Sequence, residues 1–336
     1  MKAFTYKLFF FLLCFSVLQA ESHDVQINSS ENFMPSKWNP IFPLYMFIEN
    51  LPPQTTEKIY TVKTKKEVDD EMCFDESKLQ SVLLNNDVFA LYGKPNAYTM
   101  GILGRYSVED LEPIMNEFVK MYDEANRERG VIPAFYIIYG TCWPGGDIGI
   151  LPHSTIKKYI EFAAERGWYV YIDHQIGKYT VEQAMNAILP FLKYPNVHLA
   201  LDPEWHTTQP MKIIGSVTAE EINKAQSMMS TYIKENNISG NRMLVIHQFN
   251  AIMIKNRHNV KSDYERVQLI HCADGFGSPQ LKKESYAYNA AAKNMPLKSF
   301  KLFLKPTVAG AGYDWPLMTA EEVFKLNPRP YLVMYQ

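Results

Sequence analysis

The stretch VHLALDPEW, residues 197–205, is a short run of aliphatic and small side chains that ends in two carboxylates. A short apolar run bounded by turn residues is typical of a strand buried in a parallel sheet. Pro203 cannot donate a ladder hydrogen bond and marks the end of the strand. The sequence therefore predicts that Asp202 and Glu204 lie at the C-terminal end of a buried strand.

Seven further runs of this kind occur, separated by about one helix of chain each. They are VFALYG (88–93), PAFYIIYG (133–140), WYVYIDHQ (168–175), RMLVIHQF (242–249), VQLIHCADGFG (267–277), FKLFLK (300–305) and PYLVMY (330–335). Strands that alternate with helical patterns form parallel βαβ units, and eight such units predict an α/β fold of the closed (β/α)8, or TIM-type, barrel. The active site of that fold lies at the C-terminal ends of the strands.

Helix start signals fill most of the gaps between these strands. They are Ser107, Ser154, Thr180, Thr218 and Thr319, and Glu221 completes a capping box with Thr218. The links after the fifth and sixth strands are less regular. No helical pattern follows the eighth strand before Gln336, so we expect a barrel that lacks its final helix.

Residues 1–20 have the pattern of a secretory signal peptide. Lys2 and Lys7 precede the apolar run LFFFLLCFSVL, and Ala20 offers a small-residue cleavage site. The run is too short to span a membrane, which needs about 20 apolar residues. We therefore expect an exported protein, secreted or periplasmic. A lipoprotein anchored through Cys14 is the less favoured alternative.

Residues 21–80 do not share the βα rhythm. They are rich in proline and then in charge, which predicts an N-terminal extension that wraps or caps the barrel of residues 81–336. The extension is a candidate for the place of the missing helix.

Composition excludes several classes of protein. The formal net charge is −2 and no basic run is present, so a nucleic-acid partner is not expected. No later segment predicts a membrane span, and a hydrophobic content of 47% is enough for a large core. Beyond the leader, three cysteines (Cys73, Cys142 and Cys272) cannot all pair, and we expect buried, idle thiols.

The strand ends carry the residues that could perform chemistry. Side chains alternate along a strand, so Asp202 and Glu204 share a face, and the aliphatic opposite face suits the helix layer. Two close carboxylates repel each other, and partial burial raises one pKa, which suits a general acid and a charged partner. The alternative is an Asp-Pro turn with a solvated glutamate. Asp173 on the neighbouring strand and Asp274 after the sixth strand complete the predicted catalytic set.

Other polar residues at the strand ends predict substrate contacts. They are Tyr92, Gln175, Trp205, His247, Gln248, His271, Lys301 and Tyr335. Aromatic rings stack on the apolar faces of sugars, and polar groups hold the hydroxyls. Lys301 points inward in this pattern and needs a carboxylate, either Asp173 or Asp202. A Schiff-base lysine is the alternative.

His247, and His271 with Asp274, lie at neighbouring strand ends and also leave a metal site open, with Asp202 and Glu204 as further ligands. The usual metal-binding spacings are absent, so we expect these histidines to hold carboxylates or ligand hydroxyls, with no metal. Gly145-Gly146 lacks the residues of a phosphate loop, and we expect no cofactor.

The stretches LALDPEW, IGSVTAEEIN, VIHQF, DGFGSPQLK, KLF and the terminal YQ resemble those of a group of exported bacterial barrel proteins that has no established activity. The resemblance spans residues 88–336. The carboxylate-x-carboxylate pair on the fourth strand also looks like that of several barrel glycosidases, including chitinase-like and muramidase-like ones. The chain departs from the common retaining enzymes, because KLFLK on the seventh strand carries no carboxylate. This favours an inverting or substrate-assisted mechanism.

The leading hypothesis is an exported glycoside hydrolase-like barrel that acts on a polysaccharide or glycan. Glu204 is the general acid in this hypothesis, Asp202 its charged partner, and Asp173 or Asp274 the base. The alternatives are a non-catalytic glycan-binding barrel and a metal-dependent hydrolase, since fold does not decide function. The sequence does not indicate an oligomeric state.

Overall fold

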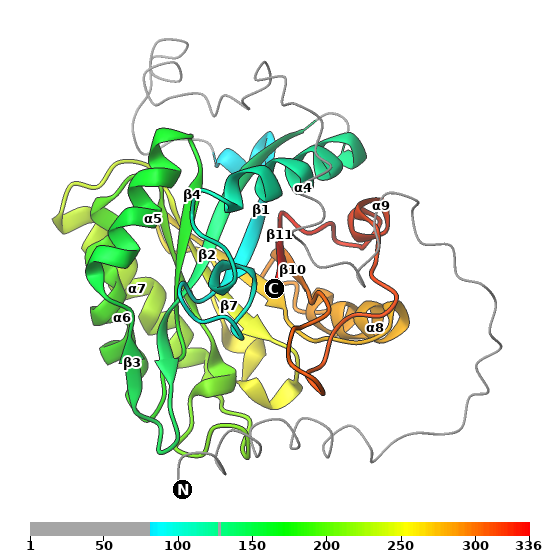
Figure 1. The fold of residues 1–336 in the computed structure, drawn as a ribbon. Helices are drawn as coiled ribbons and strands as arrows, with labels where there is room; N and C mark the ends of the chain where they lie inside the picture. Colours follow the sequence, from blue (N-terminus) through cyan, green and yellow to red (C-terminus); the bar gives the residue numbers. More distant parts are fainter. Residues whose placement is uncertain (1–80, 127–128) are drawn as a thin grey trace, which may run out of the picture.

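The computed structural model describes residues 81–126 and 129–336 of the 336-residue chain. Its centre is a ring of parallel strands (Figure 1). The strands are β1 (Asn86–Gly93), β2 (Gly130–Cys142), β4 (Tyr169–His174), β5 (Val197–Leu201), β7 (Arg242–Gln248), β9 (Val267–Ala273), β10 (Leu297–Leu302) and β11 (Leu332–Tyr335). Because β1 pairs with both β2 and β11, the sheet is closed, and the predicted (β/α)8 barrel is confirmed.

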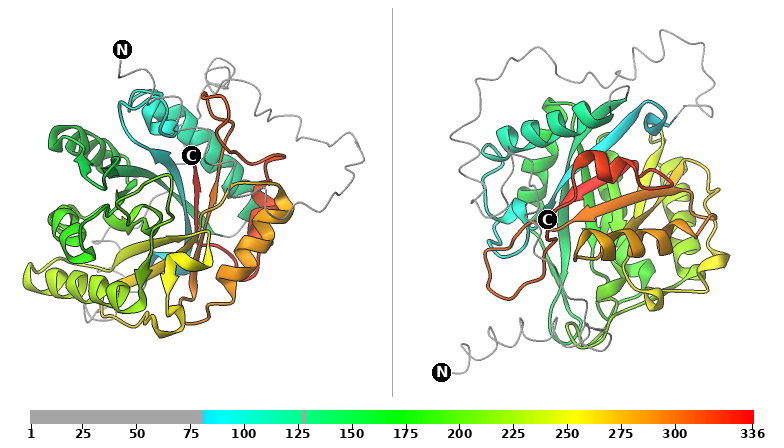
Figure 2. Two further views of the ribbon diagram at one scale, coloured as in Figure 1. Left: turned by 90° about the horizontal axis from the view of Figure 1, so that it is seen from below. Right: turned by 90° about the vertical axis from the view of Figure 1, so that its right-hand side faces the viewer.

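Helices surround the ring (Figure 2). They are α4 (Leu111–Asn126), α5 (His153–Glu165), α6 (Val181–Ile188), α7 (Ala219–Glu235), α8 (Pro279–Ala290) and α9 (Ala320–Phe324). The link after β7 is irregular, as expected: it holds the short helices η7 (Ala251–Met253) and η8 (Arg257–Asn259). Between these two helices, β8 (Ile254–Lys255) pairs with β6 (Val217–Thr218). A further short strand, β3 (Ile148–Ile150), forms an antiparallel hairpin with the end of β2.

Several of the predicted helix starts are confirmed. Thr180, Thr218 and Thr319 each cap a helix through a complete capping box. Ser107 accepts a hydrogen bond from the backbone of Asp110 in the turn before α4. The prediction for Ser154 is wrong, because α5 begins at His153 and Pro152 is its N-cap.

In the described part of the chain, no helix follows β11. Instead α9 packs against α4, with the ring of Phe324 edge-on to that of Tyr122 at 5.4 Å between centroids. Tyr335 of β11 lies beneath them and shares a hydrogen bond of 3.0 Å with the Tyr122 hydroxyl. The predicted leader and the extension of residues 21–80 lie outside the described residues.

The sheet separates two apolar cores. The outer core lies between the strands and the helices and contains Phe89, Leu199 and Leu244. The inner core fills the ring and includes small side chains such as Ala90 and Ala200. Because successive side chains of a strand point to opposite faces, each strand contributes alternately to both cores.

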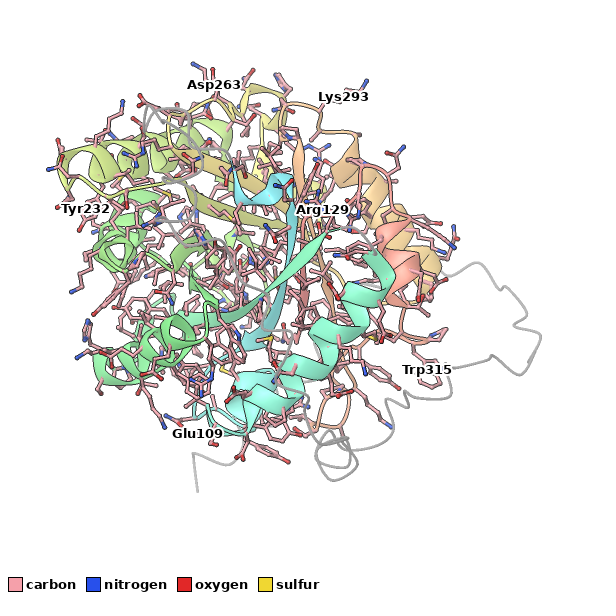
Figure 3. The ribbon with its side chains drawn as sticks, turned by 90° about the horizontal axis from the view of Figure 1, so that it is seen from above. Glu109, Arg129, Tyr232, Asp263, Lys293 and Trp315 are labelled. Carbon is pink, nitrogen blue, oxygen red and sulfur yellow. The ribbon has the colours of Figure 1, made fainter. Side chains whose placement is uncertain are left out.

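At the N-terminal end of the ring, a buried carboxylate pairs with two arginines. Asp87 of β1 is buried and accepts hydrogen bonds from Arg129 at 3.0 Å and from Asn126 at 3.1 Å, and it also pairs with Arg329. Figure 3 labels Arg129, which directly precedes β2. One carboxylate thus joins β1 to the segments that lead into β2 and β11.

Two other expectations concern thiols and membranes. Cys142 and Cys272 are free and buried, as predicted, whereas Cys73 lies outside the described residues. Across residues 81–126 and 129–336, every helix is too short or too polar to cross a bilayer.

Candidate functional site

Ionisable side chains gather inside the ring at the C-terminal ends of the strands. They are Tyr92 from β1, Tyr136 from β2, Asp173 from β4, His247 from β7 and Lys301 from β10, joined by Asp202 and Asp274, which follow β5 and β9 directly. All seven are buried. Strand alternation places them on the interior face, because each is in phase with inner-core residues of its own strand.

Asp274 holds both cations of this group. Its Oδ1 lies 3.1 Å from Nζ of Lys301, and its Oδ2 lies 2.7 Å from Nδ1 of His247. Burial alone would raise the pKa of Asp274, but Lys301 and His247 outweigh burial and lower it. Likewise, Asp274 and Asp202 keep the pKa of Lys301 above its usual value despite burial. Asp274 is therefore an ionised carboxylate with both oxygens engaged.

His247 is held at both ring nitrogens. Nδ1 donates to Asp274, and Nε2 lies 2.7 Å from the hydroxyl of Tyr136. Burial opposes the charged form, but Cys272 and the hydrogen-bonded Asp274 outweigh it, and the pKa of His247 is raised well above its usual value. The imidazole is thus a positive charge at the centre of the site.

Asp173 has a different environment. Its Oδ2 accepts a hydrogen bond of 3.0 Å from the Tyr92 hydroxyl and lies 4.0 Å from Nε2 of His247. Its Oδ1 is buried and has no hydrogen-bond partner among the described residues. Burial raises the pKa of Asp173, and the nearby His247 and Lys301 only partly offset this. Asp173 therefore keeps one carboxylate oxygen that could accept a hydrogen bond or a proton from a ligand.

Asp202 and Glu204 form the start of the short helix η6 (Pro203–Trp205). Oδ1 of Asp202 caps this helix by accepting from the backbone nitrogen of Glu204 at 3.1 Å. Burial, partly opposed by His247, raises the pKa of Asp202 to about 7. Glu204 is half-buried, and burial together with Asp202 and Asp274 raises its pKa well above the usual value. Burial and the two neighbouring carboxylates therefore favour the protonated form of Glu204.

Lys301 points into the barrel, as predicted, but its partner differs from the prediction. Asp274, rather than Asp173 or Asp202, forms the ion pair. The ammonium also lies 3.8 Å from the centroid of the Tyr92 ring. It is enclosed by a carboxylate and an aromatic face.

The structure contradicts the predicted placement of His271 and Gln248. Both point outward, beneath α8, because they alternate with the inward-facing Cys272 and His247. Nε2 of His271 lies 2.8 Å from Oε1 of Gln248, and Nδ1 lies 3.3 Å from the buried Lys298 ammonium. These side chains anchor the helix layer and do not reach the mouth of the barrel.

The predicted placement of Tyr335 at the mouth is also wrong. Tyr335 alternates with Met334, which faces the inner core, and its ring packs against Phe89 and Phe118 in the outer core. It is fully buried there. Its hydroxyl is used by Tyr122 of α4 and holds that helix to the barrel.

Gln175 and Trp205 lie at strand ends, as expected. Gln175 follows β4 directly, two residues after Asp173, and its side-chain oxygen accepts from the backbone nitrogen of Cys142 at 2.8 Å. It secures the end of β2. Trp205 is half-buried in η6, and its carbonyl accepts from the backbone of Gly177.

Tyr136 belongs to the site but was not expected there, because aromatic residues inside a strand are usually core residues. Its ring stacks on Tyr171 of the inner core at 5.1 Å between centroids. Alternation along PAFYIIYG places it in phase with Ala134 and Ile138. That phase is the signal in the sequence that could have identified it.

The predicted alternative of a metal site depends on the positions of the candidate ligands. Among the described residues, no three His, Cys, Asp or Glu side chains are grouped so that they could hold a metal ion. His247 and Asp274, both candidate ligands, are bonded to each other instead. The groups that remain available for chemistry are the carboxyl of Glu204, whose pKa is raised, and the unbonded oxygen of Asp173. The two cations, His247 and Lys301, are both bonded to Asp274.

Comparisons with known proteins give no match in sequence and only distant likenesses among solved structures. No protein-family model matches the sequence, and no curated protein is similar to it in sequence. Among solved structures, an oxaloacetate acetylhydrolase in complex with oxalate has 10% identity and a TM-score of 0.43, with 75% of each chain covered. A family 18 chitinase from Crocus vernus has 11% identity and a TM-score of 0.40, covering 74% of this chain and 92% of its own.

Cel5A from Thermotoga maritima, solved with cellobiose, has 12% identity and a TM-score of 0.40, covering 76% of this chain and 89% of its own.

Proposed function

We propose that this protein is an exported glycoside hydrolase-like barrel that acts on a polysaccharide or glycan. One observation carries the proposal: Glu204 is half-buried next to Asp202 at the end of β5, where burial and Asp202 raise the pKa of its carboxyl well above the usual value. Glycoside hydrolysis needs a proton donor for the leaving oxygen and a second carboxylate across the sugar. Export rests on the leader pattern of residues 1–20.

The environments of the other two carboxylates decide which one is the base. Asp274 is a weak base, because Lys301 and His247 occupy its oxygens and lower its pKa. Asp173 has a free oxygen and a raised pKa, and a carboxylate with a raised pKa is a stronger base. We therefore assign the base to Asp173.

The reaction would then follow an inverting course. Glu204 gives its proton to the leaving-group oxygen while the glycosidic C–O bond breaks. Asp173 takes a proton from the water that attacks the anomeric carbon from the opposite face. Lys301 lies on the seventh strand of the ring, where retaining barrel enzymes carry a nucleophilic glutamate. Its charge, with that of His247, keeps the surrounding carboxylates from repelling one another.

Incubating the purified mature chain with a panel of cell-wall and extracellular polysaccharides tests the proposal. Mass spectrometry should detect new oligosaccharides for the wild type and none for Glu204→Gln. The matched control is Glu182→Gln, an exposed glutamate of α6 that pairs with Lys224. Full activity of Glu204→Gln would refute the assignment of the acid, and no product from any substrate would refute the catalytic function.

A non-catalytic glycan-binding barrel is the second candidate. It is favoured by the burial of Asp173, Asp202 and Asp274, each at most 5% exposed, which leaves Glu204 as the accessible carboxyl of the four. A binding protein should retain a polysaccharide equally well as wild type and as Glu204→Gln, and release no product.

A further inference from the structure

A separate group of residues lies beside the mouth of the barrel, where the loop after β1 meets the hairpin of β2 and β3. Nζ of Lys94 donates to Oγ1 of Thr141 at 2.8 Å. The same ammonium lies 5.4 Å from the centroid of the Trp143 ring. Trp143 is 51% exposed although it is a large apolar side chain. A cation and an accessible aromatic ring thus stand side by side.

Lys94 has no acidic partner in the part of the chain that the structure describes. The acidic residue of the hairpin, Asp147, is already engaged: it pairs with Lys178 at 2.7 Å and accepts from the Tyr179 hydroxyl at 3.3 Å. Lys94 is half-buried, and this burial lowers its pKa. A partly desolvated ammonium bonded only to a hydroxyl is stabilised by any anion that reaches it.

The indole of Trp143 is held in place by its own hairpin. Its backbone nitrogen donates to the carbonyl of Asp147 at 2.7 Å. Gly149 packs directly on the ring, and a Cβ at that position would fall 2.0 Å from Nε1. Glycine is therefore required for the ring to lie this close to the strand, and Gly149 supports one part of the indole.

We propose that Lys94 and Trp143 form a subsite for a sugar residue that carries a carboxylate. The pyranose ring stacks on the exposed part of the indole, and its carboxylate pairs with the ammonium of Lys94. The substrate class is then an acidic glycan. This inference rests on the proposed function, since it assumes that the mouth of the barrel receives a glycan.

Binding measurements on the mature chain test the subsite without requiring turnover. The probes are tetragalacturonate, a hyaluronan tetrasaccharide and sialyllactose, each compared by calorimetry with its own carboxyl methyl ester. The ester keeps the sugar ring and removes the charge. At least one acid should bind about 5-fold more tightly than its ester at low salt, and the preference should weaken at 0.5 M salt, where charges are screened beyond about 4 Å.

Variants assign the effect to the residues. Lys94→Met should abolish the preference for the acid, and Trp143→Ala should weaken acid and ester alike. Lys178→Met, which removes an ammonium already paired with Asp147, is the control and should keep the preference. Equal binding of acid and ester, an unchanged preference in Lys94→Met, or no binding by any acid would overturn the inference.

The outcomes separate this inference from the proposed function. Cleavage of a neutral glycan that depends on Glu204, without any preference for acids, would refute the subsite and leave the hydrolase standing. A preference for acids that depends on Lys94, with no product from any glycan, would support the subsite and refute the hydrolase.

Discussion

Replacing Asp202 by asparagine should make the protein less sensitive to alkaline pH. Asp202 is 2% exposed, and burial raises its pKa from 3.8 to about 7. The unfolded chain releases this proton near pH 4, whereas the folded protein keeps it until about pH 7. Because the folded state binds more protons in that window, the stability falls as the pH rises through it.

The magnitude follows from the width of the window. Each pKa unit is worth about 1.4 kcal/mol, so Asp202 alone costs about 3 kcal/mol of unfolding free energy between pH 5 and pH 8, where its titration in the folded state is nearly complete. Asparagine carries no charge, and its side-chain oxygen can still cap η6 by accepting from Glu204. Asp202→Asn should remove this loss, equivalent to about 6–12 °C in melting temperature for a domain of this size.

Urea unfolding followed by circular dichroism at pH 5 and pH 8 measures the difference directly. The control is Asp147→Asn, because Asp147 is exposed and its hydrogen bond to Lys178 lowers its pKa. Asp147 stays ionised at pH 5 and above in both states, so this control should change with pH as the wild type does. If Asp202→Asn loses as much stability as the wild type between pH 5 and pH 8, the reasoning about its burial is wrong.

Two further substitutions test individual contacts. Lys301→Met should lower the unfolding free energy by about 3–5 kcal/mol, because it removes the ammonium that pairs with the buried Asp274. The control is Lys178→Met at an exposed lysine, which should leave the midpoint of urea unfolding nearly unchanged. A similar midpoint for both variants would contradict the role of the buried pair. Tyr335→Phe should cost about 1 kcal/mol through the lost bond to Tyr122 and leave glycan binding intact. Weaker binding by Tyr335→Phe would instead return Tyr335 to the site.

The barrel could be predicted from the sequence because its signals are local. Each strand is a short apolar run. Thr180, Thr218 and Thr319 each mark a helix start through a capping box with the residue three positions further along the chain. The boundaries differ most where the signal is weakest, as at Ser154, where a proline one residue before the helix serves as the cap.

Whether a given side chain points into or out of the barrel was harder to predict, because it depends on which of the two alternating sets of residues in the strand faces the interior. In VQLIHCAD, both Leu269 and Ile270 are apolar, so the alternation does not reveal which face is interior. Only the pairing of His247 with Cys272 across β7 and β9 settles that Cys272 faces inward and His271 outward. Asp274, two residues after Cys272, is then interior by the same phase.

The choice of partner for Lys301 required the register between strands. Ser299 of β10 pairs with Cys272 of β9. Two residues further along both strands, Lys301 therefore meets Asp274. Nothing in the sequence specifies this register, because it arises from how distant segments pack, and Asp173 was an equally valid partner on sequence grounds.

The closure of the ring at Asp87 also has a consequence for the order of folding. Asp87 and Arg329 are 242 residues apart in the chain, yet they meet at the seam between β1 and β11. At a synthesis rate of about 5–20 residues per second, β1 would wait roughly 10–50 s before its second neighbour exists. Over that interval one edge of β1 is unpaired, and such an edge can template aggregation. We therefore expect closure of the seam to be the slow and aggregation-prone step in folding of this barrel, whatever ligand its mouth receives.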